Sequence, residues 1–246
     1  MRIAFLSDIH SNRQALDACL AHAARRQIDH YVFLGDLIGY GADPSYVIDR
    51  VALLASEGAV VLLGNHDAAV IGSTEWMNDY ARAAALWTRD QLDEAQRAFI
   101  ARLPLTVAEE DRLYVHSEAV SPRSWNYITG AAEAEHSLRI TAQRLTFCGH
   151  VHRPQLYHMS PQKPARLFVP PAGAPIPLVG PRKWLAVMGA VGQPRDDNPA
   201  AAYAILDTSA NEITYLRIPY DIESAAASIH AAGLPRMLAA RLFIGR

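Results

Sequence analysis

The first 63 residues alternate short apolar runs with stretches of helical spacing, and this alternation leaves few possible folds. Apolar runs that predict buried strands lie at 2–7, 31–34 and 59–63. The segment after the first run carries apolar residues at helical spacing, namely Ala15, Leu16, Cys19, Leu20 and Ala23. Two consecutive βαβ units therefore predict a parallel sheet covered by helices.

Residues that begin or end helices support the same division. Ser11 stands three residues before Gln14 and resembles a capping box at the start of the first helix. Asp43 and Pro44 suit the N-cap and first turn of the second helix, which Gly58 ends.

The remainder of the chain predicts helices, a hairpin and a series of short strands. We expect two helices within 75–103, a hairpin of 105–108 with 113–116, a helix at 131–142, a strand at 145–148, short strands from 166 onward and a last helix that Asp221 opens. The Pro-rich stretch 161–181 is expected to form loop and edge strand. Since half of the 246 residues are hydrophobic, one domain spanning 1–246 can bury a sizeable core.

Charge and cysteine usage exclude several classes of protein. With 23 Lys and Arg against 25 Asp and Glu, the chain has no excess of positive charge for non-specific binding to nucleic acid. Cys19 and Cys148 lie within apolar runs, as buried free thiols do, and two cysteines give no disulfide framework. No apolar run approaches the roughly 20 residues of a membrane span, and no signal peptide fits the N-terminus. We therefore expect a cytoplasmic protein that acts on a small substrate, without a membrane partner; the oligomeric state stays open.

Metal-binding side chains follow directly after the apolar runs. The candidate ligands are Asp8, His10, Asp36, Asn65, His116, His150 and His152. Because the carboxyl ends of strands in an open parallel sheet share one edge, these side chains are expected to converge. Each alone is also what an ordinary strand end or turn would carry, but seven such placements together favour a common site.

The chemistry of these ligands indicates transition metals. Imidazole, carboxylate and amide oxygens suit Mn, Fe, Zn or Co, whereas Mg or Ca would prefer mainly oxygen. Seven ligands are too many for one ion, but two ions sharing a bridging carboxylate could use them all. Paired metals can stabilise both the attacking and the leaving oxygen of a phosphoryl displacement.

Five ordered motifs carry a resemblance to a known family. They are D-x-H at 8–10, GDLIGYG at 35–41, GNHD at 64–67, a single His after a strand at 116, and G-H-x-H at 149–152. This set resembles the calcineurin-like metallophosphoesterase family, in that family's order. The resemblance implies an α/β fold, a four-layer α/β/β/α sandwich with central mixed β-sheets and the active site at the carboxyl ends of the strands.

The resemblance also implies roles for the ligands. Asp8, His10 and His152 would hold one metal, Asn65, His116 and His150 the second, and Asp36 would bridge both. Two divalent transition metal ions are implied, with Mn first and Fe, Ni, Zn or Co as alternatives. The reaction would be in-line attack of a metal-bridging hydroxide on phosphorus.

His66 and Asp67 are the candidate catalytic pair. In the family this histidine assists the leaving group, and Asp67 could orient the His66 ring and favour its imidazolium form. The alternative for His66 is a role that supports the metal ligands without touching substrate.

Other polar and aromatic residues near the motifs allow two interpretations. Asn12 and Arg13 could bind a substrate phosphate, or they could cap and solvate the first helix. Trp125 and Tyr127 could line a pocket, or they could belong to the core. Gln193 and Arg195 are expected to be exposed in a loop of the segment 189–196, which resembles a stretch found in bacterial members of the family; their role stays open.

The motif details favour one branch of the family. Protein phosphatases and diadenosine tetraphosphatases of the family carry an arginine turn after Gly-Asp, which GDLIGYG lacks, and the protein phosphatases end the next motif with glutamate where this chain has GNHD. The Ser-Asp-x-His start resembles small bacterial and archaeal phosphodiesterases, so we expect hydrolysis of a small phosphodiester or nucleotide. A phosphomonoesterase or protein phosphatase, or a dinucleoside polyphosphate hydrolase, is the alternative within the family. A non-catalytic scaffold of the same fold or a metal-binding regulatory module is the alternative of another class.

Overall fold

Two six-stranded mixed sheets form the centre of the computed structural model, which describes residues 1–246. The first sheet has the order β3 (Val60–Val61), β2 (His30–Phe33), β1 (Arg2–Leu6), β11 (Ala201–Asp207), β12 (Glu212–Ile218), β9 (Pro175–Pro177). Strands β1, β2 and β3 run parallel, as the two βαβ units predicted, and β11 runs antiparallel to β1.

The second sheet has the order β4 (Thr106–Glu109), β5 (Arg112–Val115), β6 (Leu145–Cys148), β10 (Lys183–Val187), β7 (Gln155–Ser160), β8 (Lys163–Phe168). Its central strands β5, β6 and β10 run parallel. The predicted hairpin is β4 with β5, and the strand predicted at 145–148 is β6.

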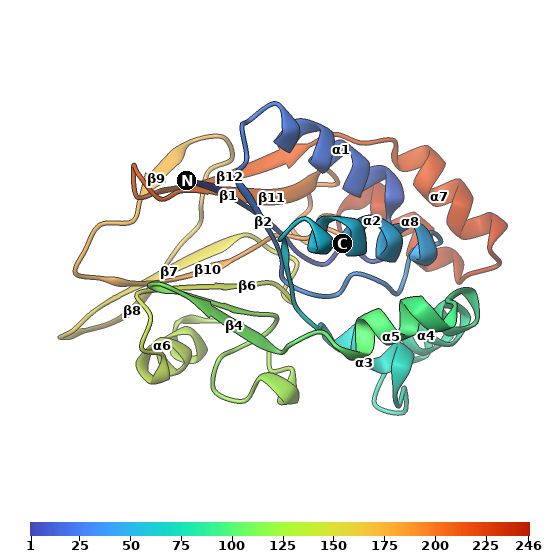
Figure 1. The fold of residues 1–246 in the computed structure, drawn as a ribbon, viewed down its shortest axis with the longest axis horizontal. Helices are drawn as coiled ribbons and strands as arrows, with labels where there is room; N and C mark the ends of the chain where they lie inside the picture. The colour runs from blue at the N-terminus through green and yellow to red at the C-terminus, as the bar shows by residue number, and fades with distance from the viewer.

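Helices cover the outer faces of both sheets (Figure 1). The first sheet is covered by α1 (Arg13–Ala24), α2 (Pro44–Ser56), α7 (Ile222–Ala231) and α8 (Arg236–Ile244), and the second by α6 (Ala131–Ile140). Helices α3 (Asn65–Ile71), α4 (Asp79–Gln91) and α5 (Glu94–Ala101) pack together at one end, and a 3₁₀ turn lies at Pro122–Ser124. The predicted four-layer α/β/β/α arrangement is confirmed.

The alternation of side chains along β1 explains how two cores meet at one sheet. Ile3 and Phe5 point between the two sheets, where the Phe5 ring stacks on Phe147 with centroids 4.1 Å apart. Ala4 and Leu6 point to the opposite face and pack with the helices. Since successive side chains of a strand alternate between faces, an unbroken apolar run such as 3–6 fits a strand buried on both sides.

The structure corrects two local predictions and bears out a third. The first helix is capped by Asn12 and not by Ser11, because the Asn12 side chain accepts the Ala15 N–H at 3.1 Å. The predicted last helix is two helices, α7 and α8. The stretch 161–181 contains β8, β9 and loops, and both strands lie at the edges of their sheets, as expected.

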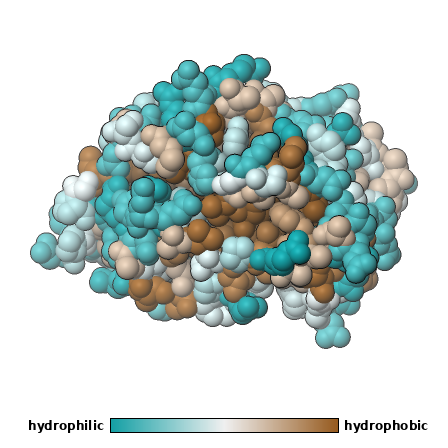
Figure 2. Space-filling model, in the orientation of Figure 1, coloured by the Kyte–Doolittle hydropathy of each residue, from teal (hydrophilic) through white to brown (hydrophobic).

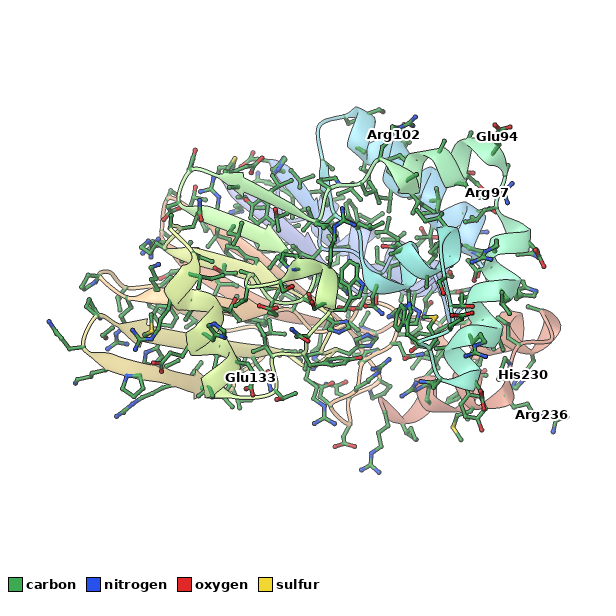
Figure 3. All side chains as sticks on the ribbon, turned by 90° about the horizontal axis from the view of Figure 1, so that it is seen from below. Glu94, Arg97, Arg102, Glu133, His230 and Arg236 are labelled. Atoms are coloured by element: carbon green, nitrogen blue, oxygen red, sulfur yellow. The ribbon has the colours of Figure 1, made fainter.

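The face drawn in Figure 2 is polar over much of its outline, with apolar residues gathered in its middle and along its lower edge. The charged side chains labelled in Figure 3, among them Arg97 of α5 and Glu133 of α6, lie at the outside of the molecule. None of the helices combines the length and the apolar character that crossing a bilayer requires.

Candidate metal centre

The candidate ligands lie where parallel strands of both sheets end. Asp8 and His10 follow β1, Asp36 follows β2, Asn65 follows β3, His116 follows β5, and His150 and His152 follow β6. Five of these seven residues have left-handed backbone conformations, with φ of 53° at Asp8, 50° at His10, 52° at Asp36, 66° at His150 and 60° at His152. Such conformations are unfavourable for residues other than glycine and concentrate at functional sites.

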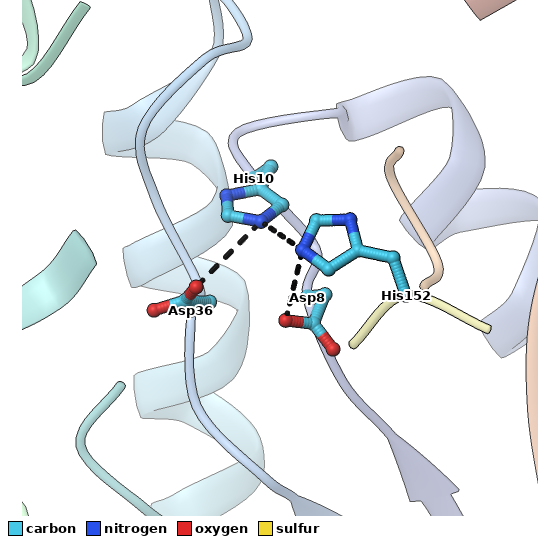
Figure 4. Close-up of side chains that lie close together, drawn as sticks. All are labelled: Asp8, His10, Asp36 and His152. Carbon is cyan, nitrogen blue, oxygen red and sulfur yellow. Dashed lines mark hydrogen bonds and ion pairs between the residues drawn. The ribbon is translucent and has the colours of Figure 1, made fainter. Parts of the chain in front are cut away.

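Asp8, His10, Asp36 and His152 form a first buried group (Figure 4). The Nε2 atoms of His10 and His152 lie 3.1 Å apart. Asp8 Oδ1 lies 3.2 Å from His152 Nε2, and Asp36 Oδ2 lies 3.7 Å from His10 Nε2. Two imidazole nitrogens and two carboxylates thus surround one small volume.

Asp36, His116 and His150 form a second buried group, so Asp36 belongs to both. Its Oδ2 atom lies 3.4 Å from His116 Nε2. Asn65 joins this group through Oδ1, which lies 3.0 Å from the same nitrogen. The structure thus brings the seven side chains together in two adjoining groups.

Backbone carbonyls fix the tautomer of each imidazole in these groups. The Nδ1 atom of His10 lies 3.2 Å from the Ile38 carbonyl oxygen, and that of His116 lies 2.8 Å from the Leu34 carbonyl oxygen. The Nδ1 atom of His152 lies 2.7 Å from the Gln193 carbonyl oxygen, and the Nε2 atom of His150 lies 2.8 Å from the Trp125 carbonyl oxygen. Because a carbonyl only accepts, each of these nitrogens must donate, and the other nitrogen of each ring carries a lone pair. Such outer hydrogen bonds are typical of metal-bound histidines.

The lone pairs of the inner nitrogens face other acceptors rather than donors. When both rings are neutral, the facing Nε2 atoms of His10 and His152 have no proton to share. His116 Nε2 faces the Asn65 and Asp36 oxygens, to which it can donate only when the ring is protonated. A cation between these groups, whether a metal ion or a proton, makes the arrangement favourable. The donor set of imidazoles, carboxylates and one amide oxygen therefore fits divalent transition metal ions.

Burial and neighbouring charges set the protonation state of each candidate ligand. Burial lowers the pKa of His150 to about 3 and that of His10 well below its usual value, which keeps both rings in the neutral, metal-binding form. At His116 burial also lowers the pKa, but the facing Asp36 carboxylate outweighs it and raises the pKa to about 9. Burial raises the pKa of Asp8, but the neighbouring His152 and His116 together outweigh it, so the pKa of that carboxyl lies below its usual value.

Two glycines permit the close approach of the ligand loops. A Cβ on Gly64 would lie 2.2 Å from Asp36 Oδ1, and a Cβ on Gly149 would lie 2.6 Å from Asp8 Oδ2. Gly64 has an extended backbone, with φ of −98°, so it is required for space rather than for a tight turn.

His66 lies beside the metal groups, but Asp67 does not orient it. The His66 ring is 5% exposed, its centroid lies 4.9 Å from that of His10, and its Nδ1 atom is buried without a hydrogen-bond partner. The Asp67 carboxylate instead accepts the backbone N–H groups of Leu37, Ile38 and Gly64 at 2.9–3.2 Å. The expectation that Asp67 favours the imidazolium is wrong, because burial lowers the pKa of His66 to about 4.

Asn12 and Arg13 are used at the start of α1. Besides capping the helix, Asn12 donates through Nδ2 to the Gly192 carbonyl at 2.9 Å. Arg13 is about half exposed, and its guanidinium lies 4.2 Å from the centroid of the Tyr46 ring and 3.5 Å from Asp17. The side chains of both residues thus make the helix contacts of the second interpretation.

Trp125 and Tyr127 belong to the site rather than to the core. The Trp125 carbonyl accepts the His150 N–H described above, and the Tyr127 ring stacks on the His150 ring with centroids 3.9 Å apart. Tyr127 is 49% exposed, so it forms part of the wall of the site that solvent reaches.

The loop after β10, within residues 189–196, contributes to the site. The sequence did not indicate what this loop does. Gln193 is 2% exposed, which corrects the expectation of an exposed residue, and its carbonyl accepts the His152 N–H. Arg195 is partly buried, and its backbone N–H donates to the His152 carbonyl at 3.1 Å. The sequence feature that could have indicated a role for Arg195 is its position in a Gly- and Pro-containing segment between two buried strands.

Comparisons with known proteins agree with this geometry. A family model described as "Calcineurin-like phosphoesterase superfamily domain" matches residues 1–211. The uncharacterized protein MJ0912 of Methanocaldococcus jannaschii is 33% identical over 99% of this chain and 98% of its own length. A crystal structure of a metallophosphoesterase from Sphaerobacter thermophilus is 34% identical, with a TM-score of 0.88 and 100% and 99% of the two chains covered. The hypothetical protein PH1004 of Pyrococcus horikoshii has the same fold at 18% identity, with a TM-score of 0.82 and coverage of 100% and 98%.

Proposed function

Because the chain belongs to the calcineurin-like phosphoesterase superfamily, we propose that it is a dinuclear metal-dependent phosphodiesterase that hydrolyses a small phosphodiester or nucleotide. The observation that carries this proposal is the pair of buried ligand groups that share Asp36. We propose manganese as the first choice of metal, with Fe, Ni, Zn or Co as alternatives. When bound, the metals would supply an activated water and offset negative charge on the phosphoryl oxygens.

His66 is the residue proposed to act on the leaving group. Its backbone N–H donates to Asp36 Oδ1 at 2.8 Å, which ties its position to the ligand shared by both groups. The neutral ring can donate a hydrogen bond to the departing oxygen. An anionic phosphoryl group beside it would raise its pKa and favour full proton transfer.

Asp67 has a supporting role in this proposal. By accepting N–H groups from the loop after β2 and from Gly64, it joins the segments that carry Asp36 and His66. It therefore holds the shared ligand and the proton donor at a fixed separation, which catalysis requires.

The preference for a diester rests on the missing arginine turn and on the GNHD motif. The test is hydrolysis of bis-p-nitrophenyl phosphate and p-nitrophenyl phosphate by chelator-treated protein, with Mn, Ni, Zn, Mg or no metal added back. Faster metal-dependent turnover of the diester supports the proposal. Faster turnover of the monoester would favour the phosphomonoesterase alternative, and no turnover of either compound with any metal would favour the scaffold.

A further inference from the structure

The loop between β10 and β11 is bonded to two of the three segments that supply the first ligand group, those of Asp8 and His152. The Gly192 N–H donates to the Asp8 carbonyl at 2.9 Å, and the Arg195 N–H donates to the His152 carbonyl at 3.1 Å. The loop is therefore fixed over the ligands by its backbone, and the side chains it carries have defined places.

The Arg195 side chain lies beside the Tyr40 ring, which packs against His66. Its terminal NH2 group donates to Gln193 Oε1 at 2.9 Å, and its guanidinium lies 5.8 Å from the centroid of the Tyr40 ring. The Tyr40 ring in turn lies 4.4 Å from the His66 ring and 4.7 Å from the His10 ring. After burial, the Arg195 charge is the next largest cause of the lowered pKa of His152.

Arg195 has no carboxylate partner of its own. Its Nε atom is buried and makes no hydrogen bond, and no carboxylate forms an ion pair with it. The two acidic residues that follow it pair elsewhere, Asp196 with Arg217 and Asp197 with Arg246. A partly buried guanidinium without an anion is unfavourable, so it is expected to have an anionic partner from outside the chain.

We infer that Arg195 binds the non-bridging oxygens of a phosphoryl group held at the metal ligands. This inference rests on the proposed function. The planar guanidinium can donate two parallel hydrogen bonds to such oxygens through its terminal N–H groups, of which the structure bonds only one, to Gln193. Arg195 thereby supplies the phosphate-binding arginine that GDLIGYG lacks, from a different part of the chain.

Binding of inorganic phosphate to the metal-loaded full-length protein tests this inference, measured by titration calorimetry. Arg195→Gln should weaken phosphate binding by roughly 10- to 100-fold, the loss typical of a charge-assisted hydrogen bond to a buried site. Arg195→Lys keeps the charge without the planar pair of donors and should fall between Gln and wild type. The matched control is Arg153→Gln, which removes an exposed guanidinium that donates to the Arg195 carbonyl, and should change affinity less than about threefold.

The outcomes separate this inference from the proposed function. Equal phosphate affinity of wild type and Arg195→Gln, at equal metal content, would overturn the inference even if the enzyme is an active phosphodiesterase, and so would equal losses in Arg195→Gln and Arg153→Gln. Specific loss of phosphate binding would support it even if no ester is hydrolysed. The melting temperature of each variant shows whether it is folded. If Arg195→Gln is unfolded, the phosphate affinity of Arg195→Lys is compared with that of the wild type. An unchanged phosphate affinity of Arg195→Lys would overturn the bidentate contact.

Discussion

The Nε2 atoms of His10 and His152 face each other at 3.1 Å, while Nδ1 of each ring is bonded to a backbone carbonyl. Two neutral rings held in this way present two lone pairs to one point. The hydrogen bonds to backbone carbonyls hold the two rings in this arrangement, and we expect a metal ion between the rings to make it favourable.

Removal of metal should therefore lower stability. A chelator such as EDTA should reduce the free energy of unfolding by about 3 kcal/mol relative to protein in metal at roughly 100 times its dissociation constant. For a chain of this size the loss corresponds to roughly 6–12 °C in melting temperature. Differential scanning calorimetry with and without added Mn checks this; identical melting curves would contradict metal binding.

Asp36 and His152 differ in how many ligand groups they serve. Since Asp36 belongs to both groups and His152 to one, Asp36→Asn should weaken binding of two metal ions and His152→Ala that of one. Metal content after equilibrium dialysis, measured by mass spectrometry, gives the stoichiometry. Equal metal loss in both variants would show that Asp36 is not shared.

His66→Ala should retain metal and lose turnover. Loss of a general acid costs about 10²- to 10⁴-fold in rate, and the loss should be smallest for substrates with acidic leaving groups, which need little protonation. A series of substituted phenyl esters measures this dependence. A His66→Ala protein without metal, or one with the same loss for every leaving group, would contradict the assignment.

Asp67→Asn should act on stability. An asparagine can accept only through one oxygen, and its amide would face a backbone N–H donor, so we expect a loss of about 2–4 kcal/mol. The control is Asp17→Asn on the exposed side of α1, where the loss should be below about 1 kcal/mol. Urea unfolding measures both, and an unchanged stability of Asp67→Asn would restore a purely catalytic role for Asp67.

The two cysteines should be inert in the folded protein. Both are buried, and burial raises the pKa of each thiol, so the reactive thiolate is scarce at pH 8. A disulfide reagent such as DTNB should label no thiol in native protein within minutes and two in guanidinium chloride. Rapid labelling of native protein would indicate that the cores around Cys19 and Cys148 open readily.

The ligands were predictable from the sequence because each follows an apolar run directly, so the end of a buried strand fixes its place. The role of Asp67 was not predictable, because its carboxylate accepts hydrogen bonds from backbone groups about 30 residues earlier in the chain. No pattern of residue types in the sequence indicates such a contact. The same reason applies to Arg195, whose position depends on the hydrogen bonds between the loop after β10 and the residues that follow β1.

Helix α8 escaped prediction for a local reason. It begins after Pro235 with no side-chain cap and no acidic residue in its first turn, so the usual signals of a helix start are missing. Asn12, by contrast, shows that a correct helix can be predicted with the wrong cap, because Ser11 and Asn12 are both good capping residues.

The most direct test of the central claim is a crystal structure of the protein grown with manganese, with anomalous scattering recorded to locate the ions. We expect two peaks roughly 3.5–4 Å apart, one among Asp8, His10 and His152, the other among Asn65, His116 and His150, with Asp36 contacting both. A single peak, or two peaks that do not share Asp36, would contradict a dinuclear centre.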